Sequence, residues 1–200
     1  MLTSEKKNTP PLDHQSLAAI ENTSPPDWNS LLCQLASIPV GRYDATNYEQ
    51  SIEKIFSAAM YPALTNPQPQ QRIHEGRKRI DITYVNIATD GFFCWLASHY
   101  PASHVHIECK NYGREIGNPE LDQLSSRFSP SRGQFGILSC RSFIDKELFI
   151  QRCKDTANDG RGFIIPLDDG DLHELVDILK SRDTSSEFSF FKNKFNRLIM

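Results

Sequence analysis

The sequence predicts an α/β fold, in which helices pack on both faces of one central mixed β-sheet of about four to five strands. From residue 104 onward, strand-like segments alternate with segments that have the apolar spacing of helices. Residues 134–140 and 162–167 are continuous apolar runs, which are typical of buried and often parallel strands. A chain of 200 residues is long enough to form one such domain around a sizeable core.

The first part of the chain divides into a lead-in and two helices. Residues 1–27 contain two Pro-Pro pairs and many Ser, Thr and Asn residues, so we expect a flexible N-terminal lead-in there. A single α/β domain then spans residues 28–200. Apolar residues at helical spacing predict one helix over residues 28–38, which ends before Pro39, and a second over residues 46–61.

Two acidic residues stand out on the second helix, before the first predicted strand. Glu49 and Glu53 are four residues apart and therefore share a face beside the apolar stripe. On this pattern alone, they could also be the solvated edge of an amphipathic helix. Residues 64–79 are polar and lead into a strand over residues 79–85, which places Asp81 among strand-forming residues.

The rest of the chain follows the alternating pattern. Residues 90–100 allow two interpretations, because Asp90-Gly91 could turn a hairpin, but the spacing of Phe92, Phe93 and Leu96 favours a short helix. Asn118 and Pro119 are residues typical of a helix start. Beside the two apolar strands, we expect a strand over residues 104–113 and helices over 118–128, 145–160 and 171–180.

Composition limits the classes of protein to consider. No apolar stretch approaches the ~20 residues that cross a bilayer, and the first 30 residues lack the apolar core of a secretory signal, so we expect a cytoplasmic protein without a membrane span. The five cysteines are scattered and suggest neither a disulfide framework nor a zinc site. The net charge of −3 hides a segregation, because residues 72–141 are net basic and residues 144–187 net acidic. This balance is compatible with a nucleic-acid partner.

The strand "HVHIECK" carries a pair of opposite charges. Side chains alternate across a strand, so Glu108 and Lys110 point to one face and Ile107 and Cys109 to the other. An isolated Glu-x-Lys pair is more often a solvent-exposed ion pair, worth roughly 0 to 1 kcal/mol. Asp81 on the preceding strand adds a second hard oxygen ligand of the kind that Mg²⁺ prefers. Together, these residues predict a site for a divalent metal and an attacking water.

The order of these motifs resembles the PD-(D/E)XK nuclease superfamily. The resemblance rests on a helix-borne Glu in "NYEQSIEKIF", an Asp on a strand in "GRKRIDITY", and Glu-Cys-Lys on the next strand, and it is greatest to restriction-endonuclease-like proteins of the type IV, Mrr-like kind. It covers residues 47–140, and a C-terminal strand and helices follow over residues 141–200. It implies a restriction-endonuclease-like core.

The resemblance also implies roles for individual residues. Asp81 and Glu108 match the metal-binding carboxylates, the backbone carbonyl of Cys109 would supply a further ligand, and Lys110 matches the lysine that positions the attacking water. Ile80 stands where the family often has proline. Glu49 matches the acidic residue of the first core helix. Glu53 is the alternative if the register differs by one turn. Gln123 matches a polar position on the helix after the Glu-x-Lys strand.

The implied activity is that of an endonuclease that uses Mg²⁺, or Mn²⁺, to hydrolyse phosphodiester bonds, most plausibly in DNA and in restriction or anti-phage defence. The alternative is a catalytically inactive member that binds nucleic acid or a protein partner. The chain could act as a homodimer or with a partner protein that delivers it to its substrate. The candidate nucleic-acid contacts, mostly basic, are Arg77, Lys78, Arg79, Asn111, Tyr112, Arg114, Gln123 and Arg127.

Overall fold

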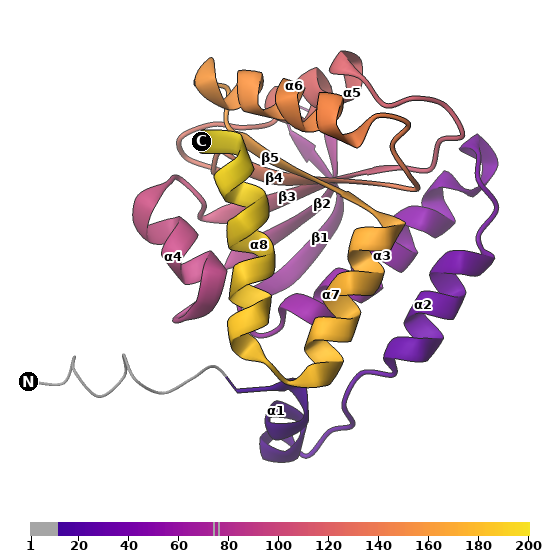
Figure 1. Cartoon of the computed structure of the whole chain (residues 1–200), viewed down its shortest axis with the longest axis vertical. Coiled ribbons are helices and arrows are strands. Elements are labelled where there is room, and N and C mark those ends of the chain that lie inside the picture. Colours follow the sequence, from indigo (N-terminus) through magenta and orange to yellow (C-terminus); the bar gives the residue numbers. More distant parts are fainter. Residues whose placement is uncertain (1–11, 74, 76) are drawn as a thin grey trace, which may run out of the picture.

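The structure, a computed structural model, describes residues 12–73, 75 and 77–200, and it confirms the α/β fold class. Five strands form one mixed sheet in the order β1-β2-β3-β4-β5 (Figure 1). The β1-β2 and β2-β3 pairs are antiparallel, and the β3-β4 and β4-β5 pairs are parallel, as the alternating pattern predicts for the later strands. The strands are β1 (Leu64–Ile73), β2 (Lys78–Asn86), β3 (His104–Lys110), β4 (Phe135–Cys140) and β5 (Phe163–Asp168).

Helices cover both faces of the sheet (Figure 1). One face carries α5 (Asn118–Ser125) and α6 (Lys146–Asn158). The other carries α3 (Ala45–Met60), α4 (Gly91–His99), α7 (Asp169–Ser181) and α8 (Thr184–Ile199). Helix α2 (Trp28–Ser37) packs on α3, and a 3-10 turn, η1 (Arg42–Asp44), joins the two. None of the described helices is long and apolar enough to cross a membrane.

The core between the sheet and the second group of helices is rich in phenylalanine. Phe92 of α4 stacks on Phe191 of α8 at 5.4 Å between ring centroids, and Phe195 packs edge-on to Phe92 and against Phe135 of β4. Phe135, Phe191 and Phe195 are fully buried. The sequence analysis did not name a separate helix over residues 184–199, although the four-residue spacing of Phe191 and Phe195 is typical of a buried helix stripe.

The structure forms β1 where we expected only a polar segment before residue 79. The strand tolerates Pro67 and Pro69 because it lies at the edge of the sheet, where the N–H side of alternate residues faces solvent instead of a second partner strand. Its register with β2 shifts between Thr65 and Gln68, as at a β-bulge. This strand brings polar and basic side chains next to those of β2.

Part of the predicted flexible lead-in is helical. Helix α1 (His14–Glu21) begins at Asp13, whose side chain accepts the N–H of Ser16 at 2.8 Å, and it buries Ala18. The ring of His14 packs edge-on against Trp28 of α2, at 5.3 Å between centroids. These contacts anchor the helix to the domain. Residues 1–11 of the predicted lead-in lie outside the described residues.

Candidate active site

Glu108 and Lys110 form a buried ion pair at the carboxyl end of β3. The Nζ of Lys110 donates to the Oε1 of Glu108 at 2.6 Å and to the Oε1 of Gln123 at 3.1 Å. The Nε2 of Gln123, on α5, donates to the same oxygen of Glu108. The two charges predicted to share a face of the strand therefore do so, and Gln123 joins them from the helix above. The pair is buried, unlike an ordinary solvent-exposed surface pair.

Asp81 lies on the same face of the sheet as Glu108. The antiparallel register pairs Ile82 with Ile107 and Thr83 with His106, so Asp81 stands opposite Glu108, one residue beyond the last registered pair. The Oδ2 of Asp81 accepts the backbone N–H of Cys109 at 2.9 Å. This bond fixes the buried carboxylate of Asp81 against β3, at the place where the two strands stop pairing.

Glu49 reaches this cluster from α3, and Glu53 does not. The Oε1 of Glu49 accepts from Arg79 at 3.3 Å, and the same nitrogen of Arg79 lies 3.4 Å from the Oδ1 of Asp81. The other oxygen of Glu49 accepts from Gln70 of β1 at 3.2 Å. Glu53, one turn later, accepts the hydroxyl of Ser57 within its own helix. Of the two predicted acids, Glu49 is therefore the one that belongs to the cluster.

The site cluster, defined here as Glu49, Asp81, Glu108, Lys110 and Arg79, holds three carboxylates against two cations. Burial, and then the charge of Asp81, raise the pKa of Glu49 and raise that of Glu108 to about 7. Burial alone would lower the pKa of Lys110, but the neighbouring Glu108 carboxylate raises it. All three shifts have the sign expected of a site that is short of positive charge.

A divalent metal fits this arrangement. The Oε2 of Glu108 is buried and has no hydrogen-bond partner among the described residues, which is costly for a carboxylate oxygen. Within the described ranges, no group of three or more His, Cys, Asp and Glu side chains is close enough to hold an ion alone. Mg²⁺, however, is usually held by one or two carboxylates together with water and substrate phosphates. Asp81 and Glu108 are the two that would hold it.

Cys109 can contribute to such a site only through its backbone. Its side chain is buried, pointing away from Glu108, and burial raises the pKa of the thiol well above its ordinary value. A protonated thiol is a poor metal ligand. Its carbonyl oxygen stays a predicted ligand.

The predicted phosphate contacts fall into two groups. Some are exposed to solvent, and others bind the backbone of neighbouring segments. Arg77 and Arg114 are exposed, Arg77 in an ion pair with Glu75 and Arg114 in one with Glu120. Arg114 also lies over the ring of Tyr112, whose centroid is 4.6 Å away. Arg79 is half-exposed beside the acidic residues. These side chains are accessible to a polyanion.

Two of the predicted basic contacts bind the backbone of neighbouring segments instead. Lys78 donates to the carbonyl of Ser126, just after α5, at 3.2 Å. Arg127 is buried, and its Nε donates to the carbonyl of Arg79 at 2.8 Å. They join β2 to the end of α5. These bonds hold the part of β2 from which the half-exposed Arg79 side chain reaches Glu49 and Asp81.

Asn111 has a structural role that its sequence position did not suggest. It is buried, and its Nδ2 donates to the carbonyls of Pro39 and Gly41, both at 2.9 Å. Its Oδ1 accepts from Arg141 at 2.9 Å, and Arg141 also binds Asp169. With its amide engaged by protein groups, Asn111 fixes the loop before α3 and is not placed to contact a phosphate.

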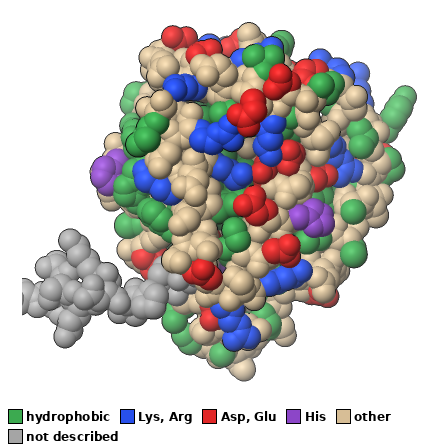
Figure 2. Space-filling model, viewed as in Figure 1, with side chains coloured by type: hydrophobic (Ala, Val, Ile, Leu, Met, Phe, Trp, Pro, Cys, Tyr) green, Lys and Arg blue, Asp and Glu red, His purple; other side chains and the backbone are tan. Residues whose placement is uncertain are grey.

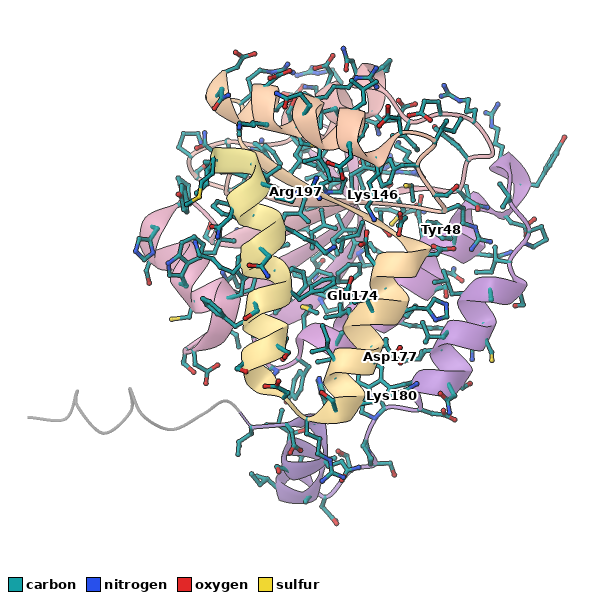
Figure 3. All side chains as sticks on the ribbon, in the orientation of Figure 1. Tyr48, Lys146, Glu174, Asp177, Lys180 and Arg197 are labelled. Atoms are coloured by element: carbon teal, nitrogen blue, oxygen red, sulfur yellow. The ribbon has the colours of Figure 1, made fainter. Side chains whose placement is uncertain are left out.

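The same polar network holds the start of α7. The hydroxyl of Tyr48 donates to Asp169 at 2.9 Å, and Lys146 donates to Asp168 at 2.8 Å and to Asp171 at 2.6 Å. Figure 3 shows Tyr48 and Lys146 near the N-terminal end of this helix. These residues connect α3, α6 and α7. They lie outside the site cluster.

Asn111→Ala is expected to lower the free energy of unfolding by about 1–3 kcal/mol, because it removes the three hydrogen bonds of a buried amide, to the carbonyls of Pro39 and Gly41 and from Arg141. It should not alter any affinity of the folded protein for a DNA duplex. Denaturant unfolding and a DNA-binding titration measure the two effects. Asn47→Ala, at an exposed position, is the matched control. A marked loss of affinity in folded Asn111→Ala would show that Asn111 contacts nucleic acid after all.

Two residues of β1 beside the site cluster, Arg72 and Gln70, were not among the predicted site residues. Arg72 pairs directly with Arg79 in the β1-β2 register, and Gln70 binds Glu49. Neither position could be identified without recognising β1 as a strand and knowing its register.

Searches against family models, curated proteins and solved structures found no match to this chain.

Proposed function

We propose that the chain is a metal-dependent nuclease that hydrolyses phosphodiester bonds, most plausibly in DNA. The observation that carries the proposal is the buried Glu108 carboxylate, which keeps one oxygen unpartnered beside Asp81 and Lys110. A structural ion pair has no need of such an oxygen, whereas a metal ligand does. The order of helix-borne Glu49, Asp81 on β2 and Glu-Cys-Lys on β3 supports the resemblance to restriction-endonuclease-like nucleases.

Each residue of the cluster has a distinct task in this proposal. Asp81 and Glu108 would hold Mg²⁺ or Mn²⁺, which when bound supplies charge neutralisation at the phosphate and lowers the pKa of water. The Lys110 ammonium donates to the attacking water and orients it towards the phosphorus. Gln123 fixes the position of Lys110 through its 3.1 Å hydrogen bond. Glu49 pairs with Arg79 and supplies the third negative charge of the cluster.

Incubation of the purified protein with supercoiled plasmid, linear duplex DNA and RNA, each with Mg²⁺ or with EDTA, tests the proposal. We expect Mg²⁺-dependent cleavage of DNA that EDTA stops. Binding without cleavage on every substrate would favour the alternative, a catalytically silent member that binds nucleic acid. If the protein neither binds nor cleaves any of these substrates, the support for a nucleic-acid function is lost.

The raised pKa of Glu108 predicts a pH dependence. Between its ordinary value and about 7, the folded protein binds more protons than the unfolded chain, so the metal-free protein loses stability as pH rises through this interval. A metal binds the ionised carboxylate, so the stabilisation by Mg²⁺ should be small at about pH 5 and should grow until about pH 8. Thermal unfolding with EDTA and with Mg²⁺ across this interval measures both effects. A Mg²⁺-induced shift in Tm that is the same at every pH would contradict the assignment of Glu108 as a ligand.

A further inference from the structure

We propose that Arg72 and Arg79 form a second anion subsite, which holds a non-scissile phosphate of the nucleic-acid strand beside the site cluster. The inference rests on the proposed function for the identity of the anion. It adds a residue, Arg72, that the sequence motifs do not contain. It also assigns Arg79 a binding role beyond its ion pairs with Glu49 and Asp81.

The β1-β2 register places Arg72 and Arg79 directly opposite each other. Arg72 pairs directly with Arg79, and directly opposite residues of an antiparallel pair share a face of the sheet. Arg79 and Asp81 share that same face, since they are two residues apart on β2 and are in contact. Arg72 therefore extends the face that carries Asp81 and Glu108 out to the edge strand.

Two like charges in directly opposite positions destabilise a strand pair unless an anion lies between them. Arg79 has Glu49 and Asp81 as partners. Arg72 is exposed and has no ion-pair partner within 4 Å in the described part of the chain. A phosphate that bridges the two side chains would turn their repulsion into attraction. Guanidinium groups are suited to this contact, because they bind phosphate oxygens through two parallel hydrogen bonds.

Arg72 places this subsite next to the reacting phosphate and not on it. One guanidinium nitrogen of Arg79 lies 3.4 Å from the Oδ1 of Asp81, whereas Arg72 stands one strand further out, at the edge of the sheet. A group held there is a neighbour of the phosphate that Asp81 and Glu108 would address. On the face that Figure 2 shows, basic side chains lie next to acidic ones.

A purely structural role is the competing explanation for Arg79. In that case, Arg79 only neutralises Glu49 and Asp81, and Arg79→Lys, which keeps the positive charge, should bind nucleic acid as the wild type does. The subsite predicts a loss in Arg79→Lys, because a lysine cannot make the two-pronged contact. It also predicts a loss in Arg72→Ala, which a structural role for Arg79 does not.

The test is the affinity for a fluorescein-labelled DNA duplex in EDTA, where no cleavage occurs, measured by anisotropy at several salt concentrations. The variants are Arg72→Ala, Arg79→Lys, Arg79→Ala and the double alanine variant. Arg197→Ala is the matched control, because Arg197 is 45% exposed and paired with Glu147, much as Arg79 is 49% exposed and paired with Glu49. Arg197 lies on α8, where Figure 3 labels it, and its partner Glu147 is on α6.

We expect each single substitution at Arg72 and Arg79 to weaken binding by about tenfold. Because both side chains hold one phosphate, the double variant should lose less than the product of the two single losses. In a plot of log affinity against log salt concentration, the slope of the double variant should be shallower than that of the wild type by about one. Arg197→Ala should change neither the affinity nor the slope by a comparable amount.

The inference is overturned if Arg72→Ala and Arg79→Ala both bind as Arg197→Ala does, or if the wild type does not bind the duplex. These binding results test the subsite and leave the proposed nuclease activity to be decided by the cleavage assay. A wild type that binds through Arg72 and Arg79 but cleaves no substrate with Mg²⁺ would retain the subsite and refute the nuclease. A wild type that cleaves while both variants bind normally would do the reverse.

Discussion

Glu108→Gln is expected to abolish Mg²⁺-dependent cleavage and, at the same time, to stabilise the metal-free protein at about pH 8. The site cluster holds three carboxylates against Lys110 and Arg79, so the substitution removes the excess negative charge, while Lys110 keeps its hydrogen bond to Gln123. Because burial and Asp81 raise the pKa of Glu108 to about 7, its ionised form is a cost to folding above that pH. Glutamine resembles the protonated form and avoids this cost.

The free energy of unfolding should rise, because the neutral amide avoids the cost of burying an ionised carboxylate. For a chain of this size, 1 kcal/mol raises Tm by about 2–4 °C. Thermal unfolding in EDTA measures the gain, and the same experiment with Mg²⁺ should show that the metal no longer stabilises the variant. Glu174→Gln, at an exposed position on α7, is the control that should change nothing. A loss of stability in Glu108→Gln would mean that Glu108 serves mainly as a structural partner of Lys110.

Lys110→Ala is expected to lose cleavage by a factor of about 10²–10⁴, the range typical of a side chain that positions or moves a proton of a reacting water. Unlike Glu108→Gln, it should also destabilise the protein. It leaves three carboxylates against Arg79 alone, and a buried charge that loses its partner typically costs about 3–5 kcal/mol. Glu108 can offset part of this cost by taking up a proton.

The two substitutions therefore have opposite effects on stability and the same effect on activity. A structural ion pair between Glu108 and Lys110 would instead predict a loss of stability in both variants. Lys54→Ala, at an exposed position of α3, is the control for the lysine substitution. A Lys110→Ala protein that is folded and cleaves at the wild-type rate would remove Lys110 from the mechanism.

The pair on β3 could be predicted from the sequence because it depends on a local rule. Alternation along a strand needs only the strand itself, and "HVHIECK" identifies that strand by its apolar set. Gln123, on the helix after the strand, was assigned to the site only through the family resemblance. The presence of Asp81 beside Glu108 depends on the antiparallel pairing of two strands. No local pattern determines that pairing, and only the order of the motifs, through the family resemblance, suggested it.

The positions that the sequence did not predict depend on tertiary contacts. Residues 64–73 have the proline and amide composition of a loop, and they pair as a strand because the exposed edge of the sheet accepts them. The place of Arg72 depends on that register. Asn111 follows Lys110 directly and so seemed to belong to the site, but its amide is held by Pro39, Gly41 and Arg141, all distant in sequence from it.

The most direct test of the site is the Mg²⁺-dependent conversion of supercoiled plasmid to nicked and linear forms, with Asp81→Ala, Glu108→Gln and Lys110→Ala beside the wild type. We predict that the wild type cleaves, that EDTA stops it, and that the three variants fold but do not cleave. Glu174→Gln and Lys54→Ala should cleave as the wild type does. Cleavage that survives the substitutions at Asp81 and Lys110 would contradict the assignment of this site.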